Sequence, residues 1–216
     1  LAGGALGYLA YTDGQILKSE QIDPITMFPP GAPFALTDHT GKKVTDEDYR
    51  GKFMLIAFGY TYCPDVCPTG LAAMSVAVDL LGEQADWVQP IFITIDPERD
   101  TPEVLKEYVT AFHPRLIGLS GTRRQIADAA EGYRVYFNKL EPLKDEDGDD
   151  DDYLMGHTTS IYLVGTDGKG VAVFNFGMAA TAVEEIADRM RHFINIQEAL
   201  AGNVRADRLE PEGADP

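Results

Sequence analysis

Residues 53–68 read Phe53-Met54-Leu55-Ile56-Ala57-Phe58-Gly59-Tyr60-Thr61-Tyr62-Cys63-Pro64-Asp65-Val66-Cys67-Pro68. The first six of these residues form a continuous apolar run, with Gly51 and Gly59 near its ends. A run of this length without polar alternation predicts a β-strand that is buried on both faces. The two cysteines of the chain follow this strand directly, at a predicted strand-to-helix junction.

An amphipathic helix is predicted over residues 67–81. Pro68 suits the first turn of a helix, and Gly82 suits its end. Apolar residues recur along this segment at the helical spacings of three and four, namely Leu71, Met74, Val78 and Leu81.

Strands and helices alternate through the rest of the chain. A hairpin is predicted over residues 34–45, and a second hairpin pairs residues 160–164 with 171–174 around the turn Thr166-Asp167-Gly168. Further strands are predicted at 91–95, 116–119 and 134–139. Helices are predicted from Asp100, with an apolar face that includes Val104, Tyr108 and Phe112, from Thr122 to Glu131, and over 181–200. This order predicts an α/β fold with a central mixed sheet, helices on both faces and an N-terminal hairpin.

Composition and charge exclude some functions. The chain has 216 residues, of which 44% are hydrophobic, and a formal net charge of −17. With so little Lys and Arg to neutralise phosphates, binding to nucleic acid is not expected, and anionic lipid surfaces are equally poor targets. Eight of the acidic residues lie between Glu141 and Asp152 beside the single Lys144. Such a block predicts a solvated surface loop that could attract a cation or a basic partner.

The organisation into segments follows from these patterns. One domain is expected over residues 30–200, and residues 201–216 are expected to be a disordered acidic tail. Residues 1–29 form an N-terminal segment whose first residues, Leu1 to Tyr11, are apolar and small. They are fewer than the roughly 20 residues that span a bilayer. They suit the trimmed end of a membrane anchor or signal segment, and also an ordinary short helix.

The cysteine pair allows three interpretations. A disulfide staple across this short loop would contribute about 2 kcal/mol, which is little for a domain with a core of this size. A redox dithiol usually has the spacing Cys-x-x-Cys, whereas Cys63 and Cys67 are four positions apart. Residues i and i+4 of a helix have Cβ atoms about 5–6 Å apart, and a disulfide needs about 3.5–4.5 Å. A metal ion held between two thiolates accommodates the wider separation.

A metal site needs at least one further ligand, and the chain has four histidines. His39 falls in a hairpin turn, His113 at a helix end and His192 within the terminal helix, so each is expected to be a surface or packing residue. His157 lies in a predicted loop between the acidic block and the strand 160–164, which makes it the candidate ligand. Two thiolates with one imidazole suit copper, in either oxidation state, or zinc.

Five motifs resemble the Sco/SenC family of copper chaperones for cytochrome c oxidase, and the resemblance covers residues 34–193. In order they are Tyr62-Cys63-Pro64-Asp65-Val66-Cys67-Pro68, Asp96-Pro97-Glu98-Arg99-Asp100-Thr101-Pro102, Leu116-Ile117-Gly118-Leu119-Ser120-Gly121-Thr122, Tyr133-Arg134-Val135-Tyr136 and Asp152-Tyr153-Leu154-Met155-Gly156-His157-Thr158. The resemblance implies a thioredoxin-like fold and one copper ion per chain, Cu(I) or Cu(II), bound by Cys63, Cys67 and His157.

The same resemblance implies a function and a location. Family members help to assemble the copper A centre of cytochrome c oxidase subunit II, and some reduce the cysteines of that subunit. The implied partners are therefore subunit II, a copper donor protein and a thioredoxin-like reductant. The implied location is the bacterial periplasm, with an N-terminal anchor in the inner membrane, or the mitochondrial inner membrane facing the intermembrane space.

Two positions depart from the family pattern. Tyr62 stands where the family often has His, and Gly156 stands where Asp commonly precedes the ligand histidine. A missing carboxylate beside His157 predicts an altered orientation of this ligand or an altered redox behaviour of the site.

An enzyme is the alternative from another functional class. A thiol–disulfide oxidoreductase or a thioredoxin-fold peroxidase would use Cys63 as nucleophile and Cys67 as resolving thiol. Replacing His157 discriminates between the two functions, because a redox enzyme tolerates the replacement and a copper site does not. A dithiol that only senses redox state or metal has the same sequence features as the chaperone.

Overall fold

The structure is a computed structural model that describes residues 31–140, 153–175 and 179–202. The N-terminal segment 1–29, the acidic block at 141–152 and all but the first two residues of the expected tail lie outside the described residues. No helix among the described residues is long and apolar enough to cross a membrane.

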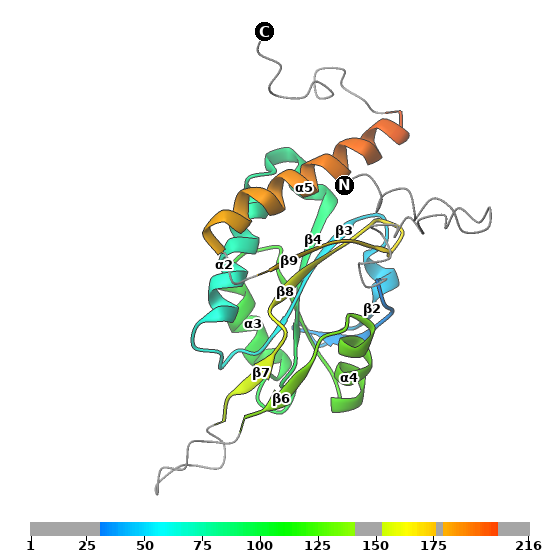
Figure 1. The fold of residues 1–216 in the computed structure, drawn as a ribbon. Helices are drawn as coiled ribbons and strands as arrows, with labels where there is room; N and C mark the ends of the chain where they lie inside the picture. Colours follow the sequence, from blue (N-terminus) through cyan, green and yellow to red (C-terminus); the bar gives the residue numbers. More distant parts are fainter. Residues whose placement is uncertain (1–30, 141–152, 176–178, 203–216) are drawn as a thin grey trace, which may run out of the picture.

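A seven-stranded mixed sheet forms the centre of the domain (Figure 1). Its order is β2-β1-β5-β4-β3-β8-β9. β3 pairs with β4, and β4 with β5, in parallel; the other pairs are antiparallel. The strands are β1 (Ala35–Asp38), β2 (Lys43–Thr45), β3 (Phe53–Gly59), β4 (Val88–Thr94), β5 (Ile117–Ser120), β8 (Ser160–Val164) and β9 (Gly170–Asn175). The predicted mixed sheet and N-terminal hairpin are confirmed.

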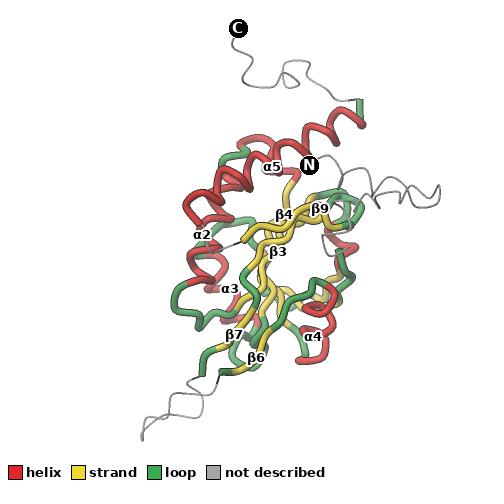
Figure 2. The backbone as a smooth tube through the Cα atoms, in the orientation of Figure 1, coloured by secondary structure: helices red, strands yellow, loops and turns green. Residues whose placement is uncertain are grey.

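β3 lies in the middle of this sheet, between β4 and β8. All seven of its residues are buried, as its unbroken apolar run predicts. Alternate side chains point into two separate cores: Phe53, Leu55 and Ala57 into one, and Met54, Ile56 and Phe58 into the other. Helices therefore cover both faces of the sheet (Figure 2).

The first face is covered by α2 (Val66–Asp79), α3 (Pro102–Thr110) and α5 (Ala179–Leu200), and the second by α4 (Arg123–Gly132). The described residues also form two short 3-10 helices, at Asp46–Tyr49 and Gly82–Trp87. The predicted apolar face of α2 is confirmed, because Leu71, Met74, Val78 and Leu81 are all buried. The capping box that Thr122 and Gln125 predict is present at the start of α4.

The predicted apolar face of α3 was partly wrong. Val104 is 37% exposed, and the fully buried residues of this helix are instead Leu105 and Val109. Tyr108 and Phe112 are only partly buried and pack against the edge of the core. The helix is therefore rotated by about one residue, so that two aliphatic side chains face the sheet and the aromatic rings lie beside them.

A second, two-stranded sheet lies outside the central one and consists of β6 (Phe137–Lys139) and β7 (Met155–His157). The strand predicted over residues 134–139 is shorter than expected, because Arg134 adopts a left-handed conformation with φ of 55° and the chain turns before β6. The assignment of His157 to a loop was wrong, since this residue ends β7 and pairs with Phe137.

Candidate metal centre

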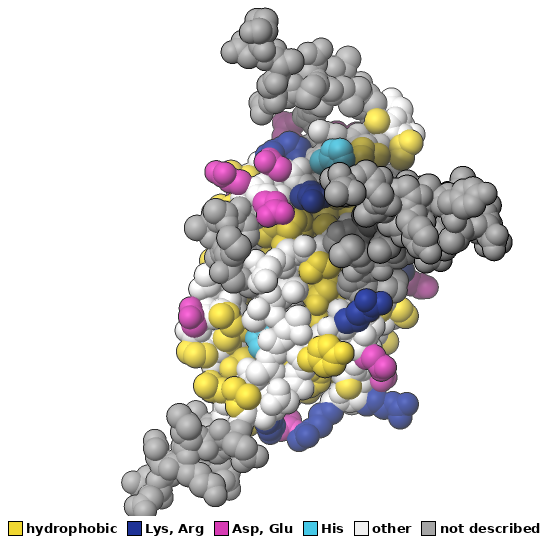
Figure 3. All heavy atoms as spheres, in the orientation of Figure 1, with side chains coloured by type: hydrophobic (Ala, Val, Ile, Leu, Met, Phe, Trp, Pro, Cys, Tyr) yellow, Lys and Arg dark blue, Asp and Glu magenta, His cyan; other side chains and the backbone are white. Residues whose placement is uncertain are grey.

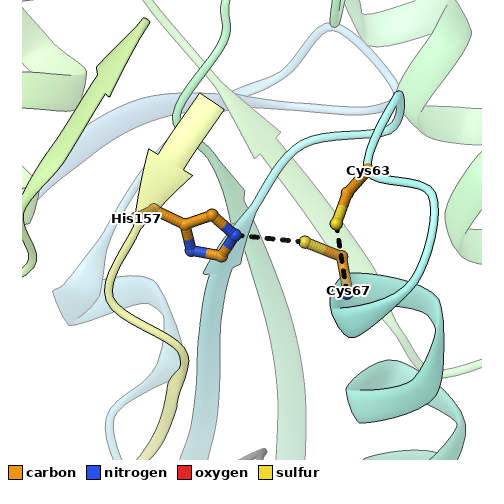
Figure 4. Close-up of side chains that lie close together, drawn as sticks. All are labelled: Cys63, Cys67 and His157. Atoms are coloured by element: carbon orange, nitrogen blue, oxygen red, sulfur yellow. Dashed lines mark hydrogen bonds between the residues drawn. The ribbon is translucent and has the colours of Figure 1, made fainter. Parts of the chain in front are cut away.

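Three side chains from distant parts of the sequence meet at one end of the domain. Cys63 lies in the loop after β3, Cys67 in the first turn of α2, and His157 at the end of β7. Their candidate ligand atoms all lie within 4.8 Å of one another. Figure 4 shows the imidazole pointing towards the Cys67 thiol, with the Cys63 thiol beside the start of α2. The structure thus brings together all three residues that were predicted to bind metal.

The loop after β3 places the Cys63 sulfur at the N-terminus of α2. The Cys63 backbone N–H donates to Tyr60 O at 3.2 Å, which tightens the turn. Asp65, at the N-cap position, makes no side-chain capping hydrogen bond. The backbone N–H of Cys67, which lies in the first turn of the helix, instead donates to Cys63 Sγ at 3.4 Å. A helix N-terminus with unpaired N–H groups favours negative charge, and it stabilises a thiolate at this position.

The two sulfurs differ in their ionisation. The hydrogen bond from the Cys67 thiol, together with those from the backbone N–H groups of Asp65 and Cys67, lowers the pKa of Cys63 to about 3, although burial acts in the opposite direction. The same hydrogen bond to Cys63, together with burial, raises the pKa of Cys67. The metal-free pair therefore consists of one thiolate and one thiol, and both cysteines are free.

His157 presents a defined nitrogen to these sulfurs. Its Nδ1 lies 2.9 Å from Thr158 O, and because a carbonyl oxygen can only accept, Nδ1 carries the proton of this hydrogen bond. In the neutral imidazole the lone pair is then on Nε2, which lies 3.4 Å from Cys67 Sγ. The Tyr60 ring and the imidazole pack in a T-shaped arrangement, with 6.0 Å between ring centroids. The ring is thereby oriented in the way that metal-binding histidines are oriented.

Gly156 does not leave His157 without an orienting partner. The Thr158 carbonyl fills this role, although the sequence suggested a missing carboxylate. A Cβ atom on Gly156 would face Asn138 Oδ1 at 3.2 Å and the Leu140 side chain. This direction lies on the opposite face of β7 from His157, because successive residues of a strand point to opposite faces.

Asp100 fastens the cysteine loop to the end of β4, a role that its sequence motif did not predict. Its carboxylate accepts hydrogen bonds from Thr61 N at 3.0 Å, Thr61 Oγ1 at 2.5 Å and Thr94 Oγ1 at 2.6 Å. Burial raises the pKa of Asp100. Sequence spacing alone could not find this contact, since 39 residues separate Asp100 from Thr61.

The remaining histidines are not ligands of this site. Nδ1 of His39 accepts from Gly118 N at 3.0 Å. His113 is buried, accepts from Arg115 N and contacts Asp79, and His192 is exposed beside Phe193. Their predicted surface and packing roles are confirmed. In the part of the chain that the structure describes, Cys63, Cys67 and His157 form the one cluster of this kind.

Exposed aromatic and apolar side chains lie beside the two cysteines. Tyr62, next to Cys63, and Val66, next to Cys67, are 60% and 41% exposed, and the exposed Asp65 lies between the cysteines in the chain. Tyr136, whose carbonyl accepts from the N–H of Thr158, is also exposed. In Figure 3 the middle of the displayed face carries hydrophobic and uncharged atoms, and charged side chains lie mainly towards its edges. The site therefore opens beside apolar side chains.

Comparison with known proteins identifies relatives of this chain. The SCO1/SenC family model matches residues 23–195. The human mitochondrial SCO1 homolog is 47% identical over 146 residues, which are 67% of this chain and 47% of that protein. The Schizosaccharomyces pombe protein sco1 is 46% identical over 148 residues, or 67% of this chain and 54% of that protein. The chain thus spans about half the length of these curated relatives.

A solved structure has the same fold. The structure of Bradyrhizobium japonicum ScoI with copper bound matches with a TM-score of 0.66 and 46% identity, and the match covers 76% of this chain and 98% of that one. The expected thioredoxin-like α/β fold is confirmed by this match together with the topology of the central sheet.

Proposed function

This chain belongs to the SCO1/SenC family, and we propose that it binds one copper ion through Cys63, Cys67 and His157 and works in the assembly of cytochrome c oxidase. The observation that supports this most directly is the convergence of three soft or borderline ligand atoms within 4.8 Å. We further propose that residues 30–200 form the copper-binding domain.

The donor set suits copper as a cargo. Thiolates select Cu(I), and an imidazole suits both copper oxidation states. Cys63 is already a thiolate in the metal-free protein, and copper would displace the proton of Cys67 on binding. The Nε2 lone pair of His157 faces these sulfurs. The protein's own residues thus supply three ligands, which leaves an incoming ligand room to exchange with them.

Transfer would proceed by exchange of ligands with a partner. The cysteines of cytochrome c oxidase subunit II would displace Cys63, Cys67 and His157 one at a time, and a copper donor protein would load the site by the reverse exchange. Partly exposed His157 and the exposed side chains of Tyr62 and Val66 lie where such a partner would approach. We place this activity at the copper A centre of subunit II, in the bacterial periplasm or the mitochondrial intermembrane space, with an N-terminal membrane anchor.

A second candidate function is reduction of a partner disulfide. The low pKa of the Cys63 thiol favours it, because a stabilised thiolate at a helix N-terminus is the attacking group of thiol–disulfide oxidoreductases. Cys63 would attack the partner disulfide to form a mixed disulfide. Cys67 would then release the reduced partner, and a thioredoxin-like reductant would restore the pair.

A transfer assay separates the two functions. Copper-loaded protein is mixed with the reduced soluble domain of subunit II, and the absorption of the copper A centre is followed. The proposal predicts that wild type transfers copper, and that His157→Ala does not transfer copper although it still reduces the oxidised domain. Equal disulfide reduction by both proteins, with no copper transfer by wild type, would establish the reductase and reject the chaperone.

A further inference from the structure

The proposed copper ligands come from two different parts of the domain. Cys63 and Cys67 follow β3 of the central sheet, whereas His157 ends β7 of the separate two-stranded sheet. Cys67 and His157 are 90 positions apart in the chain. β8, which begins three residues after His157, pairs with β3, and side chains between β7 and the cysteine loop add the contacts that adjust the distance between them.

Arg99 lies between these two parts. Its guanidinium carbon is 3.6 Å from the centroid of the Tyr153 ring and 4.5 Å from that of Tyr62. The Arg99 side chain is only 12% exposed. A guanidinium over the face of an aromatic ring is held by the negative charge of the π-system, more strongly when water is excluded. Arg99 thus binds one ring from each side of the site.

The two rings belong to the segments that carry the copper ligands. Tyr62 directly precedes Cys63, and Tyr153 lies in the segment that leads into β7 and His157. The Nζ atom of Lys139, at the end of β6, also lies 3.9 Å from the Tyr153 ring centroid. Displacement of Arg99 would therefore remove a contact from both segments at once.

Asp96 fixes Arg99 to the central sheet. Its Oδ2 accepts from Arg99 Nε at 2.6 Å, its Oδ1 accepts from the Tyr153 hydroxyl at 2.8 Å, and its backbone N–H donates to Thr94 Oγ1 at the end of β4. Asp96 is almost completely buried. Asp96 and Arg99, which follow β4 in the chain, thus contact the rings of both Tyr62 and Tyr153 or their hydroxyl groups.

Tyr60 adds one further tie between the same two parts. Its hydroxyl accepts from Met155 N in β7 at 3.2 Å, and its ring packs against the imidazole of His157. Arg99 also lies 5.8 Å from the Tyr60 ring centroid. Loss of Arg99 would therefore loosen β7 without removing its last contact to the cysteine loop.

We infer that Arg99 is a positioning residue, which holds His157 against the cysteine pair and thereby favours Cu(II) over Cu(I) in the site. This inference rests on the proposed copper function. Two thiolates alone satisfy Cu(I), whereas Cu(II) depends on nitrogen donors such as the imidazole. A displaced His157 therefore weakens Cu(II) binding more than Cu(I) binding, and the reduction potential of bound copper rises.

A purely electrostatic role for Arg99 predicts the opposite sign. A positive charge close to copper disfavours Cu(II) relative to Cu(I), because Cu(II) carries the larger charge. Removing only that effect would lower the reduction potential. The direction of the change in potential therefore distinguishes positioning from a simple effect of charge.

The test compares Arg99→Ala and Arg99→Lys with wild type. Affinities for Cu(I) and Cu(II) are measured by ligand competition, the Cu(II) site by EPR, and the potential by redox titration. Loss of a residue that orients a metal ligand costs about tenfold in affinity or more. We expect at least such a loss for Cu(II) in Arg99→Ala, a smaller loss for Cu(I), and a rise in potential of about 59 mV for each tenfold change in their ratio. Arg99→Lys, which keeps the charge, is expected to lie between wild type and Arg99→Ala.

Arg123→Ala is the matched control. Arg123 forms an ion pair with Glu98 in the same region and is largely exposed, and its removal changes the net charge equally. This variant should bind Cu(I) and Cu(II) with the same affinities as wild type. A second control adds Arg99→Ala to His157→Ala, where it should cause no further loss of Cu(II) affinity. Tyr153→Phe removes the hydrogen bond to Asp96 but keeps the ring, and should show the same changes as Arg99→Ala at smaller size even if Arg99→Ala does not fold.

Three results would overturn the inference: equal weakening of Cu(I) and Cu(II), a fall in potential, or an undiminished Arg99 effect in the His157→Ala background. Failure of the proposed copper function looks different, because wild type itself would then bind no copper at this site.

Discussion

Gly59, the last residue of β3, lies directly against the Cys67 thiol. A Cβ atom on Gly59 would come within 2.7 Å of Cys67 Sγ and within 2.9 Å of the Phe92 ring. The absence of a side chain at position 59 thus makes room for the sulfur of Cys67, a proposed copper ligand. Through this contact, β3 in the middle of the sheet directly adjoins the proposed metal site.

Gly59→Ala should displace the Cys67 sulfur and weaken copper binding. The added methyl group would meet the Cys67 sulfur and the Phe92 ring, and overpacking of this kind costs about 1–3 kcal/mol of stability. We expect a loss of copper affinity, measured by ligand competition, that exceeds what the loss of stability alone would cause.

Gly118→Ala serves as the control for this variant. A Cβ atom on Gly118 would meet Val109 and Leu105 at 3.0 and 3.2 Å, in a part of the core that does not contact the copper ligands. This variant should lose stability but keep its copper affinity. Wild-type copper affinity in Gly59→Ala would show that Cys67 is not held where the structure places it.

The cysteine pair should react with alkylating agents in an unusual way. The pKa of Cys63 is lowered to about 3, so Cys63 is a thiolate throughout the range from pH 5 to pH 8. Its rate of alkylation by iodoacetamide in the metal-free, reduced protein should therefore hardly change over this range. The rate for an ordinary thiol rises about tenfold with each pH unit below its pKa. Cys67, whose pKa is raised, should react slowly.

Two substitutions of Cys67 test the cause of this low pKa. Cys67→Ser keeps a hydrogen-bond donor to the Cys63 thiolate and should preserve the flat pH profile. Cys67→Ala removes the donor that contributes most to lowering the pKa, so the reaction rate should then increase with pH. A tenfold increase per pH unit in wild type would contradict the proposed thiolate.

Asp100 should contribute to stability through its three hydrogen bonds to Thr61 and Thr94. Asp100→Ala leaves three donors without their partner, and we expect a loss of about 2–4 kcal/mol in the free energy of unfolding. Asp100→Asn keeps most of these hydrogen bonds and should be much milder. Chemical denaturation measures both, and equal stabilities of the two variants would refute this role.

The effect of Asp100 on the free energy of unfolding should depend on pH in a defined direction. Burial raises the pKa of Asp100, so the folded protein binds this proton more tightly than the unfolded chain does. The contribution of Asp100 to stability therefore increases as the pH falls from its folded-state pKa towards 3.8, the ordinary pKa of an Asp side chain. Wild type should gain stability relative to Asp100→Asn over that interval, as measured by denaturation at a series of pH values.

Sequence reasoning predicted the central sheet well, because β3 and the following helix have strong apolar patterns. It also placed both cysteines where a parallel strand meets a helix. It missed the strand β7, since Met155–His157 is too short to show a periodic pattern and follows an acidic block. Its pairing with β6 depends on contacts between segments far apart in the chain.

The contacts that position the cysteine loop and the histidine strand could not be predicted from the sequence either, because they too join segments far apart in the chain. Arg99, Asp100 and Tyr153 stood in recognised motifs, but local spacing carries no information on which rings or hydroxyl groups they contact. For Val104, spacing within a helix was likewise not enough to predict which side chains are buried. Its spacing to Tyr108 and Phe112 fitted an apolar face, and only packing against the sheet favoured Leu105 and Val109.

Copper titration of the fully reduced protein tests the central claim most directly. Absorption and EPR should show one copper ion per chain and, for Cu(II), a sulfur-to-copper charge-transfer band. This band should disappear in Cys63→Ser and Cys67→Ser. It should also be lost or strongly changed in His157→Ala, because Nε2 of His157 lies 3.4 Å from Cys67 Sγ. Absence of copper binding by wild type, or an unchanged band in His157→Ala, would contradict a copper site made of these three residues.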